Sequence, residues 1–359
     1  MTLGERSHRF FSIKEKTVWQ KLLLISAPLL VPIAILAYLL DVEVTRQISF
    51  ARKELIGLEY LRDTRLLREH LQKHRGLANG YLSGDASLKS AVLAEQVQVE
   101  NAIRDTEVAD QKYGTLLGVS NQWSATKAKW AALKNRVFSL KPVETFDEHT
   151  ALIADVLSLA LDVGEYSNLI LDPQTDSHFI QDIMVSRLPA SGEALAKTRG
   201  MGTGIAARKA LTADEKTELI VQIGTMQIAR QFVGRYLTSA FRYNPSLKPR
   251  LEAAGQEYVT ATDAYVQLLK MRIIDAEQID IPPQEFFNQA TRAISANFNV
   301  FDTCYPVLGE LLTARITMMR NRLILASAGV LVALILSIGV GFWVARGINR
   351  QLTSLLGTE

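Results

Sequence analysis

Cysteine and histidine are scarce in this sequence of 359 residues, and their scarcity excludes several kinds of protein. Cys304 is the only cysteine, so no internal disulfide framework can form. It lies on an apolar stripe, where we expect it to be buried and inert. Among the five histidines only His70 and His74 have a spacing that suits one helix face. Because no third ligand accompanies them, we predict no metal site and interpret both histidines as solvated helix surface.

The motifs of enzymes and of nucleic-acid-binding proteins are also lacking. The sequence has no nucleophile motif and no glycine-rich phosphate loop. Its net charge of +3 is small, and the basic residues form no concentrated stripe. We therefore predict that the protein is not an enzyme, needs no cofactor and has no nucleic-acid partner.

Two long apolar runs are present, at residues 22–40 and 323–344. The second has 22 uncharged residues, which as a helix would span about 33 Å, enough to cross a bilayer. A buried helix of a soluble domain is the alternative for either run. A cleaved signal peptide is a further alternative for the first, but no small-x-small cleavage site precedes the charged residues after Leu40. We predict two transmembrane helices, each in contact with membrane lipid.

Charge predicts the orientation of these helices. The tail 1–21 has more basic than acidic side chains: Arg6, Arg9, Lys14, Lys16 and Lys21 against Glu5 and Glu15. Such a tail stays in the cytoplasm. The protein is then a two-pass protein of a bacterial inner membrane, with residues 41–322 in the periplasm. Residues 345–359 return to the cytoplasm.

The periplasmic region has the apolar spacing of a helical bundle. Leu152, Val156, Leu159 and Val163 alternate steps of four and three residues, which is typical of a buried helix face. Thr145 with Glu148 and Thr212 with Glu215 form possible capping boxes, and glycines and prolines mark other helix ends. They predict an all-α fold with helical segments at residues 42–79, 86–114, 121–139, 146–171, 176–209, 213–242, 246–276 and 284–345.

The region contains a short internal echo. Residues 75–80 (RGLANG) are similar to residues 199–204 (RGMGTG), and both stretches lie late in a predicted long helix. Two bundle modules of about 124 residues would fit the region. A six-residue similarity can also arise by chance, so a duplication and a coincidence both stay open.

Three short motifs carry a resemblance to known sensors. Residues 72–77 (QKHRGL) and 81–84 (YLSG) resemble the Q-x-x-R-G-L…L-x-S-G pattern of nitrate- and nitrite-sensing (NIT-type) domains. Residues 167–179 (SNLILDPQTDSHF) resemble a segment in the periplasmic domains of methyl-accepting chemotaxis proteins, diguanylate cyclases and histidine kinases. Residues 346–352 (RGINRQL) resemble the opening of a HAMP linker.

The resemblance implies the sensory half of a methyl-accepting chemotaxis protein. Such receptors have two four-helix modules, act as homodimers and relay a signal through HAMP to cytoplasmic partners, here expected after Glu359. The same ectodomain attached to a histidine kinase or a diguanylate cyclase is the alternative. A structural or partner-binding membrane protein that senses no small molecule is the third hypothesis.

Arginines are the candidate ligand-binding residues, because a guanidinium offers a planar fork that suits nitrate or a carboxylate. Arg75 and Arg199 are the first choices, since each precedes a glycine that permits close approach. Arg62, Arg65 and Arg68 lie one or two turns before Arg75 on the same helix, and Arg62 and Arg65, three residues apart, could point together. The alternative for each is a surface ion pair. We therefore expect a small anionic ligand, such as nitrate, nitrite or an organic acid.

Overall fold

The chain is almost entirely helical in a computed structural model that describes the backbone of residues 18–356 and the side chains of residues 31–348 and of Arg350. No strand occurs among these residues, which confirms the predicted all-α class. Contacts divide the chain into two compact units. One unit is Ala51–Ala314, and the other comprises the ends of the chain, up to Phe50 and from Arg315 on.

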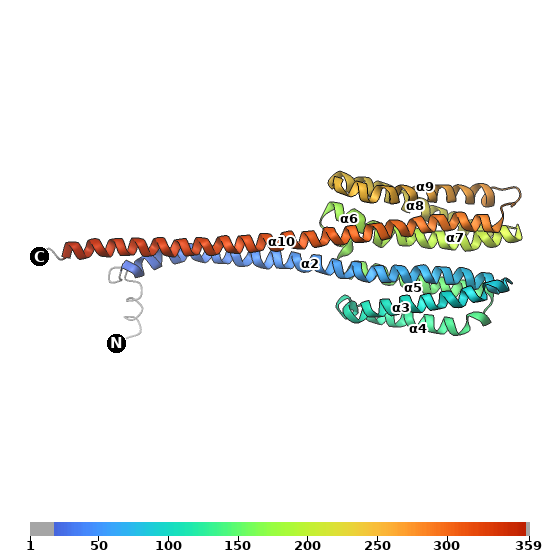
Figure 1. Ribbon diagram of the computed structural model, residues 1–359, viewed down its shortest axis with the longest axis horizontal. Helices are drawn as coiled ribbons and strands as arrows, with labels where there is room; N and C mark the ends of the chain where they lie inside the picture. The colour runs from blue at the N-terminus through green and yellow to red at the C-terminus, as the bar shows by residue number, and fades with distance from the viewer. Residues whose placement is uncertain (1–17, 357–359) are drawn as a thin grey trace. The chain divides into compact units, whose positions relative to one another are not determined.

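The first half of the unit Ala51–Ala314 is a four-helix module (Figure 1). Its helices are α2 (Val18–Leu82, here from Ala51), α3 (Lys89–Leu117), α4 (Ser120–Arg136) and α5 (Pro142–Tyr166). Single 3₁₀ turns flank them at Ala86–Leu88, Val137–Ser139 and Leu169–Leu171. The predicted stripe of α5 is buried: Leu152, Val156, Leu159 and Val163 all belong to the core.

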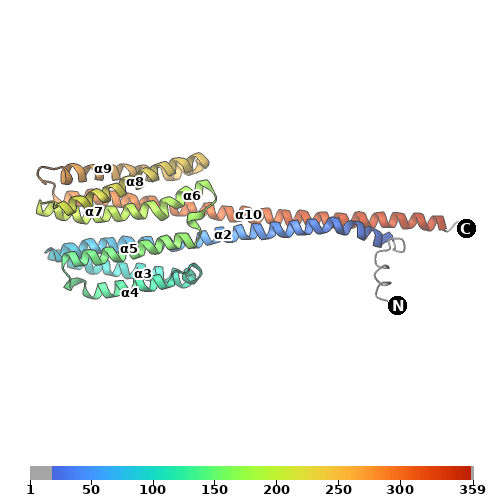
Figure 2. The same ribbon diagram turned by 180° about the vertical axis from the view of Figure 1, so that it is seen from behind.

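The second half is another four-helix module. Its helices are α7 (Leu188–Arg208), α8 (Ala213–Tyr243), α9 (Lys248–Leu269) and the first part of α10 (Pro283–Leu356). The short α6 (Thr175–Asp182) precedes α7, and a 3₁₀ turn, Pro245–Leu247, precedes α9. Figure 2, seen from behind, agrees with Figure 1 that α2 and α5 lie on the side of the first module nearest to α7 and α10.

Most predicted helix ends are close to the observed ones, and the exceptions have local causes. The predicted capping box at Thr212 is present, because the hydroxyl accepts from Glu215 N–H. The one at Thr145 is wrong. Pro142 starts α5 earlier, and the Glu144 carboxylate accepts the N–H of Lys141 instead, so Thr145 lies inside the helix.

The predicted helix 176–209 contains a π-helical turn at Ile183–Arg187. Pro189 has no N–H with which to bond the carbonyl four residues earlier, and the N–H of Leu188 bonds the carbonyl of Ile183. The turn connects α6 with α7, so the predicted segment is helical along its length but not a regular α-helix.

One described helix is long and apolar enough to cross a membrane. It is α10, whose apolar window has no buried residue, and it contains the predicted run 323–344. The other predicted run, 22–40, lies within α2, but the side chains of residues 22–30 are outside the described part of the chain. A membrane-spanning α10 is therefore supported, and the two-pass topology stays a prediction.

Candidate functional site

A polar stripe runs along α2 where hydrophobic side chains would be expected. Arg65, Arg68, Gln72 and Arg75 follow one another at steps of three, four and three residues, which places them on one helix face. All four are buried, and their contacts reach α7 and α10 of the second module. The boundary between the two modules is thus rich in charge, and every buried charge there needs a partner.

Arg65 is neutralised by two carboxylates. Its Nη1 atom donates to Glu69 Oε2 at 2.7 Å and its Nη2 atom donates to Asp302 Oδ2 at 2.6 Å. Its guanidinium carbon lies 4.4 Å from the ring centroid of Phe298 on α10. The Nε atom is buried and has no hydrogen-bond partner among the residues that the structure describes. Arg65 therefore ties α2 to α10 and keeps one unused donor.

Arg68 forms no ion pair with a carboxylate among the described residues. Its side chain is only 3% exposed, and its Nε and Nη2 atoms have no hydrogen-bond partner in the same part of the chain. Its guanidinium carbon lies 5.5 Å from the centroid of the Phe298 ring. The guanidinium of Arg65 stacks on the same ring. Burial and the positive charge of Arg65 lower the pKa of Arg68 to about 10. At neutral pH it is still a cation, held beside another cation.

Arg199 on α7 contributes a further buried cation. Its Nη1 atom donates to Thr291 Oγ1 at 3.3 Å, and its guanidinium carbon lies 4.9 Å from the ring centroid of Phe287. Burial lowers its pKa to about 10, and the positive charge of Arg75 acts in the same direction. Within the described residues, Arg199 forms no ion pair with a carboxylate.

A cleft of about 450 Å³ lies between Arg65 on α2 and Arg199 on α7. Its wall combines basic, acidic, hydroxyl and amide side chains with two apolar ones. The lining residues are Arg65, Glu69, Gln72, Lys73, Arg199, Thr291, Ile294, Ser295, Phe298, Asn299 and Asp302. The cleft therefore offers fixed N–H and O–H donors from α2, α7 and α10 to a small polar molecule.

Arg75 does not line the cleft, and its guanidinium is already paired with a carboxylate. Its Nη1 and Nη2 atoms donate to Glu193 Oε1 at 2.6 Å and to Glu193 Oε2 at 3.3 Å. Gln72 Nε2 donates to the same carboxylate at 2.8 Å, and Arg75 Nη1 also donates to Thr150 Oγ1 at 2.9 Å. The ring of Phe146 lies under the guanidinium, 4.9 Å from its carbon atom. Through Thr150 and Glu193, Arg75 joins α2 to both α5 and α7.

The interpretation of His70 and His74 as solvated surface is wrong. His74 is fully buried, and its Nδ1 atom lies 2.7 Å from Nε2 of His149, while His149 Nδ1 lies 2.6 Å from the carbonyl of Thr145. His70 is half-buried and contacts Glu95 instead. The two histidines thus have separate partners, and the described residues contain no cluster of three metal-ligating side chains.

The four predicted ligand-binding arginines lie in three different environments. Arg65 and Arg199 both line the cleft. Arg75 is next to it but is paired with Glu193. Arg62 is 48% exposed, pairs with Asp63 and does not line the cleft. The glycines also differ, because a Cβ on Gly76 would meet nothing within 4 Å, whereas one on Gly200 would lie 3.1 Å from the Phe146 ring.

Glu193 was not among the predicted site residues, and Arg68 was considered only after Arg75 and Arg199, although each leaves a signal in the sequence. Glu193 is the only charged residue between Arg187 and Lys197, in a stretch of small and apolar residues. Such a carboxylate is buried when the helix packs and needs a cation. Arg68 continues the three- and four-residue steps from Arg65 to Gln72. Only the fold shows that the two modules cover this stripe.

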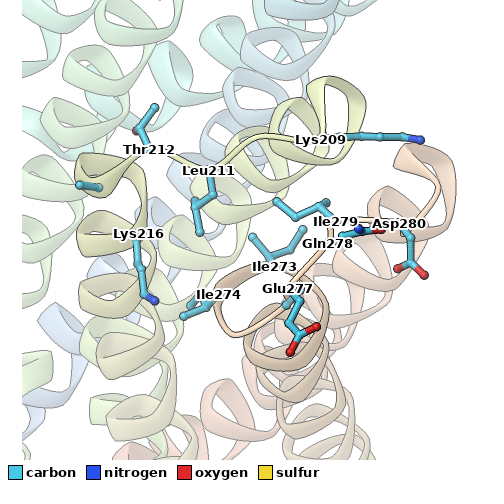
Figure 3. A pocket seen from close by; sticks show the side chains of 12 residues that line it. Lys209, Leu211, Thr212, Lys216, Ile273, Ile274, Glu277, Gln278, Ile279 and Asp280 are labelled. Carbon is cyan, nitrogen blue, oxygen red and sulfur yellow. The ribbon is translucent and has the colours of Figure 1, made fainter.

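A second hollow, of about 630 Å³, lies between the start of α8 and the loop before α10 (Figure 3). Leu211, Ile273 and Ile279 form its apolar part, while the side chains of Lys209 and Asp280 extend away from it. No buried cation or converging set of donors is found there among the described residues. It lacks the chemistry of a specific anion site.

A family model matches most of the chain. No curated protein and no solved structure matches it significantly. The family described as "nitrate and nitrite sensing" (NIT) matches residues 67–303, which is more than half of the chain and includes α2 from Leu67, the whole of α3 to α9, and α10 as far as Thr303. Arg68, Arg75 and Arg199 lie within the match, whereas Arg65 lies just before it. The chain therefore belongs to the family of nitrate- and nitrite-sensing (NIT) domains.

Proposed function

We propose that this protein is a membrane receptor whose cleft binds a small monovalent oxyanion, nitrate or nitrite. One observation carries the proposal, namely two buried guanidinium groups without a counter-charge. Arg65, Arg75 and the exposed Lys73 pair with Glu69, Asp302 and Glu193. Arg68 and Arg199 are also buried at the module boundary, and they form no ion pair with a carboxylate among the described residues. A buried charge of this kind is costly unless an anion accompanies it.

The donors suit a planar oxyanion. A guanidinium presents parallel N–H groups that match two oxygens on one central atom. Arg199 has no carboxylate partner among the described residues. Its Nη1 atom donates to the hydroxyl of Thr291 at the long distance of 3.3 Å. Thr291 and Asn299 add polar atoms to the wall. We infer that the anion lies against Arg199, with Arg65 and Arg68 contributing positive potential.

Occupancy of the cleft would be relayed through α10. Thr291, Phe298 and Asp302 line the cleft and belong to the same helix as the apolar run 323–344. A ligand shifts an equilibrium between two arrangements only if it binds one of them better. We infer that binding favours one position of α10, and that a change in this helix carries the signal across the bacterial inner membrane.

The output follows from the resemblance in the motifs. We infer a homodimer that signals to cytoplasmic partners through a HAMP linker beginning near Arg346, with chemotaxis as the leading output. A histidine kinase or diguanylate cyclase output is the alternative. The sensor itself acts by binding rather than by catalysis.

The proposal is tested by thermal unfolding of the full chain in detergent, with nitrate or nitrite replacing gluconate at constant total salt. A ligand at about a hundred times its dissociation constant adds roughly 2.7 kcal/mol to the free energy of unfolding. Each kcal/mol raises the midpoint by about 2–4 °C in proteins of moderate size. We expect such a rise with nitrate or nitrite, and a smaller one with sulfate.

Two matched variants locate the site. Arg199→Met removes the unpaired guanidinium from the cleft and should abolish the rise. Arg62→Met removes an arginine of α2 that lies outside the cleft and should retain it. An equal rise in both variants, or no rise in the folded wild type with either anion, would overturn the proposal.

A further inference from the structure

The two modules repeat one three-residue arrangement. In each module an arginine followed by glycine lies on the first helix, and a phenylalanine and a threonine four residues apart lie on the last helix. The first set is Arg75 on α2 with Phe146 and Thr150 on α5. The second set is Arg199 on α7 with Phe287 and Thr291 on α10. The similarity between residues 75–80 and 199–204 is thus accompanied by a repeated arrangement of side chains in the structure.

The two sets also agree in their contacts. Each guanidinium carbon lies 4.9 Å from the centroid of its phenylalanine ring. Each Nη1 atom donates to its threonine hydroxyl, at 2.9 Å for Arg75 and 3.3 Å for Arg199. Both hydroxyls donate to the carbonyl of their own phenylalanine at 2.8 Å. The hydroxyl hydrogen therefore points to the backbone, and its oxygen accepts from the arginine in both modules.

The sets differ in one respect, which is the presence of a carboxylate. Glu193 reaches across from α7 and accepts from both Nη atoms of Arg75 and from Gln72. Arg199 has no such carboxylate among the described residues. Since a carboxylate and a nitrate ion present two oxygens to a guanidinium in a similar way, Glu193 stands where a bound anion would stand.

We propose that Arg75, Phe146, Thr150 and Gln72 form a second anion site, and that the side chain of Glu193 is its built-in occupant. The site takes a small planar monoanion with two or three oxygens: a short carboxylate, nitrate or nitrite. It is closed, because Arg75 is 1% exposed and Gly200 lets α7 pack against the Phe146 ring. A free anion therefore enters only when the Glu193 carboxylate is absent.

The test removes the occupant and supplies it again as a small molecule. In the full chain in detergent, Glu193→Ala leaves Arg75 buried without a counter-charge, so the midpoint of thermal unfolding should fall. Formate, acetate or nitrate, titrated against gluconate at constant total salt, should restore most of the loss and saturate. The shift on restoration should be at least about 3 °C, as expected for a stabilisation on the order of 1 kcal/mol.

Two further variants make the result specific. Arg75→Met with Glu193→Ala removes both charges, and this double variant should unfold without any response to formate. Glu193→Gln keeps the site filled, and it should respond less than Glu193→Ala. Saturable rescue in Glu193→Ala alone supports the site. Rescue of equal size in the double variant, or none in a folded Glu193→Ala protein, overturns it.

If Glu193→Ala does not fold in gluconate, the yield of folded protein is measured instead. Expression and purification are then repeated with formate throughout, and recovery of monodisperse protein that depends on formate supports the site. No recovery, when the double variant folds, overturns it. Repeating the titration with Arg199→Met present separates this inference from the proposed function, because the cleft is then disabled and only the Arg75 site can respond.

Discussion

At the scale of single residues, the buried histidine pair has defined proton positions. His149 Nδ1 donates to the carbonyl of Thr145, since a carbonyl only accepts. Its Nε2 atom is therefore unprotonated and accepts from Nδ1 of His74. Burial, with the neighbouring His149, lowers the pKa of His74 to about 3, and burial, with the charge of Arg75, lowers the pKa of His149 to about 4. Both rings are neutral at physiological pH.

These shifts predict how stability depends on pH. In the unfolded chain both histidines take up protons below their ordinary pKa of 6.5, whereas the folded protein keeps them neutral down to about pH 4. Their contribution to stability is complete above pH 6.5 and is lost as the pH falls toward 4. The loss is about 1.4 kcal/mol per pH unit for each histidine. Denaturant unfolding of the full chain between pH 7 and pH 5 measures this slope.

The comparison variant is His74→Gln with His149→Gln, which has no titrating group at this position. Its free energy of unfolding should be lower at pH 7 but should fall less steeply toward pH 5 than that of the wild type. Equal slopes in the two proteins would show that the pair is not kept neutral in the folded state.

The residue scale also shows what the sequence could predict about the site. The residue type was predictable, because a fork of donors suits an oxyanion, and Arg65 and Arg199 do line the cleft. The partners of these arginines were not predictable. Glu193 lies 118 positions from Arg75, and no local pattern indicates which of the arginines it neutralises. That choice depends on how α7 packs against α2, so Arg75 was predicted as a ligand contact but is paired internally.

At the scale of helices, α2 contains a glycine on which packing depends. A Cβ at Gly57 would overlap the buried side chain of Ser167, just before the left-handed Asn168 at the end of α5. Gly57→Ala should therefore lower the free energy of unfolding by about 1–3 kcal/mol, as overpacking does in a rigid core. Thermal unfolding of the full chain measures this.

Gly76 provides the matched control in the same helix. A Cβ there would meet nothing within 4 Å, so Gly76→Ala adds only helix propensity. It should be neutral or stabilise by up to about 1 kcal/mol. A loss of stability in Gly76→Ala as large as in Gly57→Ala would contradict the packing argument.

The helices themselves were largely predictable, because their apolar spacing and terminal residues are local signals. The stripe from Leu152 to Val163 is buried, and α8 starts at the predicted position, Ala213, with Thr212 as its N-cap. The π-turn at Ile183–Arg187 was not predicted. It arises from a missing N–H at Pro189 within a segment whose composition is otherwise helical. The start of α5 was also missed, because two capping patterns overlap there and the earlier one, at Pro142, is used.

At the scale of the whole molecule, α10 connects the sensor to the rest of the chain. Helix α10 carries the cleft residues Thr291 and Phe298 and continues through Pro306 to the apolar run 323–344. Its polar and apolar parts are not separated by a break within the described residues. The proposed function requires that the apolar run of this helix crosses the membrane and that the segment from Arg346 on lies in the cytoplasm.

The single cysteine makes this topology testable by labelling. Cys304 is buried, and burial raises the pKa of its thiol to about 12, so the wild type should not react with a maleimide. Thr212→Cys and Arg346→Cys each place a thiol at an exposed position. In spheroplasts, a membrane-impermeant maleimide should label Thr212→Cys at once and Arg346→Cys only after the membrane is permeabilised. Labelling of both before permeabilisation would place residues 212 and 346 on the same side and exclude a relay through α10 to the cytoplasm.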